Sequence, residues 1–283
     1  MKRYELTDEQ WQLIEPLLPK RTATTGRPPK DPRHMFNGIL WDLCSGAPWR
    51  DMPERFGPWQ TVYDYYRNWR NQGTFDRIVG TLQIHLDRQG KIDWDLWCID
   101  GSTVRATRAA AGASKKSLTQ HPQEPEDHAL GRSRGGFSSK FHLVTDGLGL
   151  PLAVEVTPGQ RHESTQVEAV MNDIAIPQPI GRPRRRPQRL AGDKGYSYPT
   201  IRRWLRAHGI RAVIARKSNQ RKGSRPFDKQ SYRRRCVIEQ CVGWLKECRR
   251  IGTRFEKLAI SFLAMFKLAM IRRYLRLAFS DRA

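Results

Sequence analysis

The stretch KFHLVTDGLGLPLAVEVTPG, residues 140–159, decides the fold of this chain. Apolar and β-branched side chains dominate both of its halves, and the middle, from Asp146 to Gly149, carries residues that favour tight turns. The pattern predicts a hairpin of two strands. The upstream run WDLWCIDGSTV, residues 94–104, predicts another strand that ends near a glycine. The chain beyond residue 92 therefore opens with a meander of strands.

Downstream of the hairpin, helical and strand-like segments alternate. We expect helices over residues 161–174, 198–209, 231–250 and 254–279, and strands over 188–196 and 210–215. A meander followed by such alternation predicts an α/β layer fold with a mixed sheet. Between the first two strands, residues 105–136 are rich in Gly, Ala, Ser and charge, which predicts a long mobile loop.

The first 92 residues show helical patterns only, at 7–18, 31–45, 59–73 and a segment that runs through Ile84. Thr7 and Asp31 are predicted N-caps, and Gly46 is a predicted helix end. We therefore divide the chain into a helical domain, 1–92, and an α/β domain, 93–283. Aromatic residues and arginines interleave on the third helix, which is compatible with a helix-turn-helix module that reads DNA through Gln60, Tyr63, Arg67 or Arg70. Such stripes more often belong to a core.

The charge of the chain points to a polyanionic partner. Its 283 residues carry 51 Lys and Arg against 28 Asp and Glu, a net charge of +23, which is too large for a protein that handles neutral metabolites. Residues 182–235 hold 19 of these cations against only Asp193 and Asp228. A phosphate-binding groove needs one sign of charge concentrated in this way. The alternative, a disordered basic tail, fits poorly because the stretch is internal and broken by apolar segments.

The cysteines and the apolar runs indicate a reducing cytoplasm and no membrane span. Five cysteines form no C-x-x-C pair and no cluster at zinc spacing. The N-terminus shows no pattern of a secretory signal. The longest apolar run, residues 258–271, is interrupted by Lys267 and is shorter than the roughly 20 residues that a span needs. It predicts a buried helix.

Two aspartates stand where open α/β sheets present their chemistry. Asp100 follows the apolar run at residues 96–99 and precedes a glycine, and Asp193 lies in AGDKGY after a shorter apolar run. Both are predicted at the exit of a strand. An Asp before Gly is also a common turn former, so each residue alone is an ambiguous signal. Together they predict a site for a phosphate or a metal ion.

A third acid, Glu239, lies on a strongly two-faced predicted helix. At about 100° per residue, one narrow stripe contains Tyr232, Arg235, Glu239, Gly243 and Lys246, opposite an apolar face. The stripe could be a solvated surface with an ion pair between Arg235 and Glu239. It could also face nucleic acid, with the carboxylate on a divalent cation and the basic residues on flanking phosphates. Oxygen ligands without a Cys or His set favour Mg²⁺, with two ions and with Mn²⁺ as a substitute.

The spacing Y-x2-R-x3-E-x6-K, formed by Tyr232, Arg235, Glu239 and Lys246, resembles the signature of a large group of bacterial insertion-sequence transposases. CIDGSTVRA and AGDKGYS resemble the segments that carry the two aspartates of these enzymes, in the order Asp, Asp, Glu. Three segments near the front, LTDEQWQLIEPLLP, GAPWRDMPERFGPW and TVYDYYRNW, resemble the helical domain of insertion-sequence five members. The resemblance covers nearly the whole chain apart from the loop at 105–136.

This resemblance implies a ribonuclease H-like catalytic core and a metal-dependent enzyme that cleaves and transfers DNA strands. The implied catalytic and metal-binding acids are Asp100, Asp193 and Glu239. The implied partners are the terminal inverted repeats of the element and target DNA, bound by a homodimer in a bacterial cytoplasm, at the nucleoid. His142 and His162 are expected near the site as structural residues or secondary DNA contacts. The rival functions are a nuclease of the same fold that does not join strands, and a non-catalytic regulator or other basic protein that binds nucleic acid.

Overall fold

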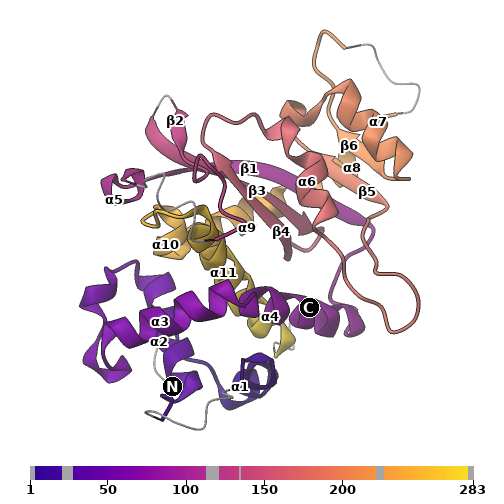
Figure 1. Ribbon diagram of the computed structural model, residues 1–283. Helices are drawn as coiled ribbons and strands as arrows, with labels where there is room; N and C mark the ends of the chain where they lie inside the picture. Colours follow the sequence, from indigo (N-terminus) through magenta and orange to yellow (C-terminus); the bar gives the residue numbers. More distant parts are fainter. Residues whose placement is uncertain (1–3, 21–27, 113–120, 134, 221–225, 280–283) are drawn as a thin grey trace.

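The computed structural model describes residues 4–20, 28–112, 121–133, 135–220 and 226–279, which form a mixed sheet flanked by helices (Figure 1). The strands are β1 (Leu96–Arg105), β2 (Gly131–Ser133), β3 (Gly136–Asp146), β4 (Pro151–Pro158), β5 (Arg189–Gly192) and β6 (Arg211–Ile214). Their order across the sheet is β4-β3-β1-β5-β6, and the short β2 pairs with the start of β3. The predicted α/β class with a mixed sheet is confirmed.

The strand directions give the sheet a ribonuclease H-like topology. β3 runs antiparallel to both β1 and β4, whereas β5 and β6 run parallel to β1. Three antiparallel strands followed by two parallel ones is the arrangement that the resemblance implied. Residues 96–99 at the start of the central strand are 0 to 1 % exposed, because helices cover both of its faces.

Asp146 builds the predicted hairpin turn between β3 and β4. Its carboxylate accepts hydrogen bonds from the backbone N–H groups of Leu148, at 3.0 Å, and Leu150, at 2.8 Å. Gly149 takes the left-handed conformation, with φ of 83°, which favours glycine. The other carboxylate oxygen of Asp146 accepts from the N–H of Asp93, so the turn also fixes the chain that leads into β1.

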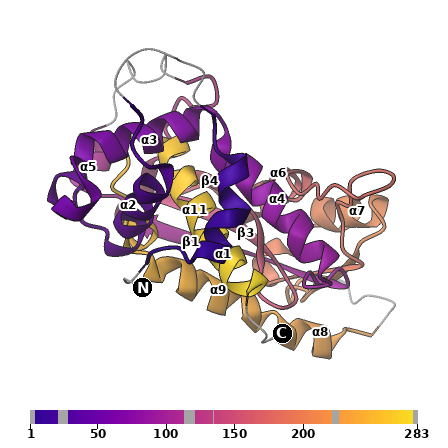
Figure 2. The same ribbon diagram turned by 90° about the horizontal axis from the view of Figure 1, so that it is seen from below.

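Helices cover the sheet on two sides. α8 (Lys229–Arg234) packs on β5 and β6, and α9 (Cys236–Glu247) packs on β1 and β3; on the other face lie α6 (Val167–Asn172), against β3 and β4, and α7 (Pro199–Ala207), against β6. Figures 1 and 2 show α9 and α6 on opposite faces. This layering sandwiches the central strands and leaves the carboxyl ends of the parallel strands at one edge.

The N-terminal helices α1 (Asp8–Ile14), α2 (Pro32–Ser45), α3 (Trp59–Asn71) and α4 (Thr74–Arg88) form the lower part of Figure 1. α11 (Ala259–Ala278) packs on α2 and α4 and also on β4. The Gln83 amide of α4 donates to the Leu152 carbonyl of β4, at 2.8 Å. One hydrophobic cluster runs through both parts. The division at residue 92 therefore remains a prediction about folding units that share a core. In the described residues, no helix has the length and apolarity that crossing a membrane requires.

Three predicted helices differ from the structure. The segment 161–174 is α-helical only in α6, since the His162 ring accepts from the N–H of Ser164 and caps a 3₁₀ turn first. The segment 231–250 is divided into α8, α9 and α10 (Arg249–Gly252), with a tightened turn at Arg235. The segment 254–279 becomes helical only at α11, because Arg254 pairs through its backbone with Arg105.

Part of the predicted mobile loop is packed. The carboxylate of Glu124 accepts from the N–H groups of Ala259, at 2.8 Å, and Ile260, at 3.1 Å, so it caps α11 from a distant part of the chain. The buried guanidinium of Arg254 donates to the carbonyls of His128 and Ala129. The loop also contains the short helix α5 (Arg108–Ala111), whereas residues 113–120 and 134 lie outside the described residues.

Candidate active site

Two of the predicted acids meet on neighbouring parallel strands. The register between β1 and β5 runs from Leu96 opposite Arg189 to Cys98 opposite Ala191. Two residues further along the chain in each case, Asp100 and Asp193 reach the same level. Asp193 directly follows the end of β5, as predicted, but Asp100 lies in the middle of β1, which continues to Arg105, so its predicted place at the exit of a strand is wrong. Their turns are similar too, because the Asp100 carboxylate accepts from the N–H of Gly101 and that of Asp193 from the N–H of Gly195. The structure therefore brings Asp100 and Asp193 together.

Crowding of negative charge marks this position. The pKa of Asp100 is raised to about 6. Burial is the largest cause, and the nearby charges of Glu163 and Asp193 act in the same direction, against the lowering effects of the Gly101 N–H and Arg235. The charged form is therefore disfavoured unless a cation approaches. A carboxyl group with a raised pKa among other acids is typical of a functional site.

Glu163 is a fourth acid at this site, and the sequence analysis did not identify it. It begins the 3₁₀ turn Glu163–Thr165 after β4 and packs against the backbone of Gly101, the residue after Asp100. A Cβ on Gly101 would lie 2.6 Å from the Glu163 Cγ atom. Lys140 of β3 donates to Glu163 at 3.1 Å. The only sequence signal was an acid beside His162 shortly after a strand.

Tyr196 was also missed. It lies in the turn after Asp193, buried against Gly192, and its hydroxyl has no hydrogen-bond partner among the described residues. Burial raises the pKa of Tyr196 well above its usual value, and the charges of Glu163, Asp100 and Asp193 add to this. An unpartnered buried hydroxyl beside several acids is rare in folded proteins and indicates a polar site.

Arg235 links the third acid to the first. One guanidinium nitrogen lies 3.7 Å from the Asp100 carboxylate, and the other donates to Glu239 at 2.5 Å. The side chain of Glu239 is 56 % exposed, compared with 21 % for Asp100 and 18 % for Arg235. Glu239 therefore lies at the rim of the site, on the far side of the half-buried Arg235 from Asp100.

The predicted polar stripe of α9 faces the same region. Lys246 reaches the backbone carbonyl of Thr103 on β1, at 3.5 Å, and the ring of Tyr232 lies 5.9 Å from the Arg235 guanidinium carbon. On the opposite side of the helix, Cys241 and Leu245 are buried. The two-faced pattern is confirmed. Whether these three basic and aromatic residues bind DNA remains a prediction.

The acids offer carboxylate oxygens, which are the ligand atoms that a hard divalent cation prefers. Asp100 and Asp193 offer carboxylate oxygens at one level, and their mutual repulsion would be relieved by such an ion. Within the described ranges, however, no group of three or more Asp, Glu, His or Cys side chains is close enough to hold an ion. Arg235 explains this, since it stands between Asp100 and Glu239. The pair fits, and the third acid is held apart from it.

The other candidates have structural contacts. His142 is buried, hydrogen-bonds Thr157 at 2.8 Å and has its pKa lowered to about 4 by burial, so it is neutral. His162 is exposed and lies beside Tyr198. On α3, Arg70 donates to the hydroxyl of Ser261 in α11, and Arg67 is exposed. Neither arginine contacts the acids, and their role in DNA binding remains a prediction.

Comparison with known proteins gives the same picture for both parts of the chain. Residues 95–273 match the family described as "Transposase DDE domain", and residues 6–79 match "Putative transposase of IS4/5 family". The "Putative transposase for insertion sequence element IS402" of Burkholderia cepacia is 36 % identical over 184 residues, which are 59 % of this chain and 82 % of that protein. The "Putative transposase for insertion sequence element IS6501" of Brucella ovis is 29 % identical over 140 residues, which are 49 % of this chain and 99 % of that protein.

The "Crystal structure of the Mos1 Strand Transfer Complex" is similar at 13 % identity, covering 83 % of each chain with a TM-score of 0.26. A likeness this low carries no weight, and the fold assignment rests on the strand order.

Proposed function

Because this chain belongs to the DDE transposases of the IS4/5 family, we propose that it binds the terminal inverted repeats of an insertion sequence, cleaves the strands at their ends and joins them to target DNA. A DDE transposase cleaves and transfers DNA strands. The observation that best supports the assignment to particular residues is the common level of Asp100 and Asp193 on β1 and β5, with Glu239 connected through Arg235. We assign the catalytic role to these three acids.

Enzymes with this domain generally use divalent metal ions, and we propose two Mg²⁺, replaceable by Mn²⁺, on Asp100, Asp193 and Glu239. Such ions, when bound, neutralise charge on the reacting phosphate and lower the pKa of attacking water. Asp100 and Asp193 would supply two of the ligands. Glu239 would complete the set once released by Arg235, and its exposed side chain leaves room for that change.

The basic residues then hold the DNA. Arg235, freed from Glu239, binds a phosphate beside the reacting one, Lys246 binds the next, and the Tyr232 ring supports Arg235. Attack by water breaks a phosphodiester bond and leaves a 3′ hydroxyl. In the second step that hydroxyl attacks a target phosphodiester, so one P–O bond forms as another breaks, with the new bond opposite the leaving oxygen.

The partners follow from this reaction. Two element ends have to meet one target, so we propose that a homodimer forms on DNA. The N-terminal helices, with Arg67 and Arg70, and the basic stretch 182–235 supply binding to duplex DNA, although residues 221–225 of that stretch lie outside the described residues.

The test uses the full chain with Mg²⁺, a labelled duplex that carries the element end, and a supercoiled target plasmid. Joined products that require both DNAs support the proposal. Cut ends without joining identify a nuclease, and a stable complex without cutting identifies a binding protein. Asp100→Asn serves as the control, since products that persist in that variant come from a contaminating enzyme.

A further inference from the structure

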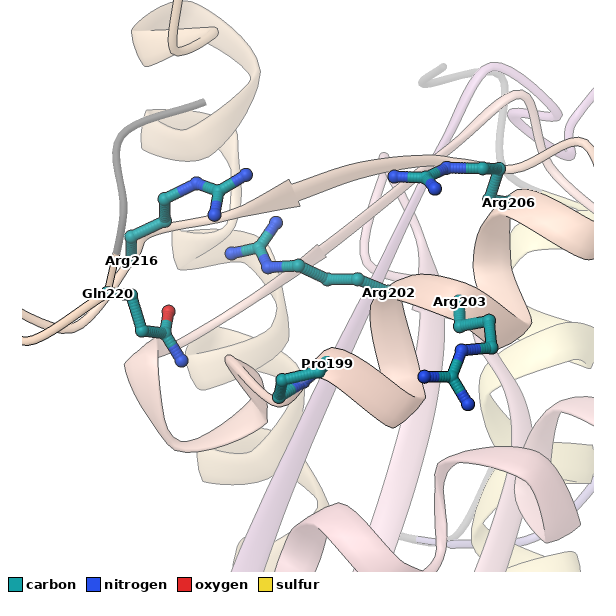
Figure 3. Close-up of a pocket in the computed structure, with 6 residues that line it drawn as sticks. All are labelled: Pro199, Arg202, Arg203, Arg206, Arg216 and Gln220. Carbon is teal, nitrogen blue, oxygen red and sulfur yellow. The ribbon is translucent and has the colours of Figure 1, made fainter. Parts of the chain in front are cut away.

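Two adjoining hollows on α7 and β6 form a basic surface away from the three acids (Figure 3). The first is lined by Pro199, Arg202, Arg203, Arg206, Arg216 and Gln220. The second shares three of these arginines and adds Arg211. We call this surface the arginine groove. Five arginines and no acidic residue line its two parts.

Like charges are forced together in this groove. Figure 3 shows the guanidinium of Arg202 beside that of Arg216. Burial lowers the pKa of Arg202, and the charge of Arg216 lowers it further. The Arg202 Nε atom is buried and has no hydrogen-bond partner in the described part of the chain. Arginines crowded in this way repel one another, and a bound anion would lower that cost.

The groove is tied rigidly to the turn that carries Asp193. Arg202 donates to the hydroxyl of Ser197, at 2.9 Å, and to the carbonyl of Ile214, at 2.8 Å. The Ser197 hydroxyl in turn donates to Gln220, at 2.6 Å. Ser197 is the fourth residue after Asp193, so their Cα atoms are at most about 14 Å apart. The groove is therefore anchored on the turn that follows Asp193, near the proposed position of the reacting phosphate.

The groove and the α9 stripe lie on different sides of the acids. Arg235 and Lys246 approach β1 from α9. The arginine groove lies on β6, which is separated from β1 by β5 and carries α7 on the opposite sheet face from α9. The acids thus have one basic surface on each side. Strand transfer brings two DNA segments to one site, and two basic surfaces match that requirement.

We propose that the arginine groove binds the phosphodiester backbone of a DNA segment other than the stretch held by Arg235 and Lys246. The several planar guanidinium groups suit successive phosphates, and the lining includes no aromatic ring on which a base could stack. Binding is therefore independent of base sequence. The segment is either target DNA or a further part of the element, and both offer the same chemistry. The proposal rests on the proposed function only for the position of the reacting phosphate.

The test replaces the exposed residues and keeps the structural one. Arg203→Gln and Arg206→Gln, singly and together, remove charge from the groove, while Arg202 keeps its bonds to Ser197. Arg276→Gln, an exposed arginine of α11 outside both the N-terminal helices and the basic stretch, is the matched control. Thermal unfolding establishes that each variant is folded. The binding probe is a labelled duplex of random sequence, titrated at several salt concentrations.

Each groove substitution should reduce the magnitude of the log–log salt slope by about 0.9, and the double variant by about 1.8, with no change for Arg276→Gln. A slope that is unchanged in the folded double variant overturns the proposal. Strand transfer of pre-cut ends at increasing target concentration, beside cleavage of uncut ends, then identifies the segment. A defect only in transfer assigns target DNA, and a defect in cleavage assigns the element. If the wild type neither cuts nor joins DNA while the groove substitutions still reduce the salt slope of binding, the proposed function is wrong and the groove is still a DNA-binding surface.

Discussion

Glu163 occupies the space that any side chain at position 101 would need, because a Cβ on Gly101 would lie only 2.6 Å from its Cγ atom. The glycine follows Asp100 directly, so its lack of a side chain lets a second carboxylate approach the first. Lys140 holds Glu163 in place from β3. The geometry of the acid on β1 therefore depends on a residue that follows β4.

Replacing Gly101 by alanine should disturb the site more than the fold. We expect Gly101→Ala to displace Glu163, to abolish or strongly reduce cleavage, and to lower the free energy of unfolding by about 1–3 kcal/mol through overpacking. DNA binding should remain. Cleavage, gel-shift titration and urea unfolding measure the three effects. Gly80→Ala in α4 is the control, since its Cβ meets nothing within 4 Å. Equal activity in both variants would show that the contact is unimportant.

Glu163→Gln should shift the pH profile of cleavage. The charge of Glu163 raises the pKa of Asp100, which is about 6. In the proposed reaction Asp100 acts as a carboxylate, so activity should fall as the pH drops through this pKa. Removing the neighbouring charge lowers the pKa, and the acidic limb of kcat/KM should move to lower pH. Glu168→Gln, on the exposed side of α6, should leave the limb in place. A limb that does not move in Glu163→Gln rules out this coupling.

Arg235→Gln should produce the opposite shift. Arg235 lowers the pKa of Asp100, so its loss should move the acidic limb to higher pH. The substitution also removes a proposed phosphate contact, and the salt slope of binding to the element end should become smaller by about 1. The two readouts separate the effect on the acid from the effect on DNA. If the variant keeps both the wild-type acidic limb of the pH profile and the wild-type salt slope of DNA binding, Arg235 has neither proposed role.

Asp100→Asn, Asp193→Asn and Glu239→Gln should each abolish strand cleavage and leave DNA binding intact or slightly stronger. The amides preserve size, but each removes a negative charge and an oxygen ligand. Glu247→Gln, at the end of the same helix α9, is the control for Glu239. If Glu239 were only a surface residue of the helix, the Glu239→Gln variant would cleave DNA at the normal rate, and its free energy of unfolding would fall by only a few tenths of a kcal/mol. Cutting of a labelled terminal-repeat duplex decides between the two.

His142 should make the stability of the chain fall in mild acid. Its pKa is lowered to about 4 by burial, whereas an unfolded His titrates near 6.5. Between these values the unfolded chain binds more protons. The contribution of His142 is therefore complete above about pH 6.5 and is lost as the pH falls toward 4, by roughly 3 kcal/mol. Urea unfolding of His142→Leu should show a flatter pH dependence than the wild type. Parallel curves would contradict this assignment.

The strands and the two aspartates could be predicted from the sequence because their signals are local. Asp146 and Gly149 mark a turn within four residues, and Asp100 and Asp193 each follow an apolar run. The contact of Glu163 with Gly101 could not be predicted in this way, since it forms only when the chain after β4 folds back across the sheet.

The helix boundaries that were missed have the same origin. α11 begins at Ala259 because Glu124, 135 residues earlier, accepts its first free N–H group. No local capping residue announces that start. The basic stretch 182–235 was evident as a charge excess, but only the packing of α7 on β6 turns part of it into a groove.

α11 packs on α4 and on β4, and Gln83 bonds the two parts directly. Because both parts pack against α11, the helices proposed to read DNA are held at a fixed position relative to the acids proposed to cut it. The protein core would then set the number of base pairs between the recognised sequence and the broken bond. Element ends with one base pair inserted in that interval should still be bound, and the cut should stay at the same distance from the recognised sequence.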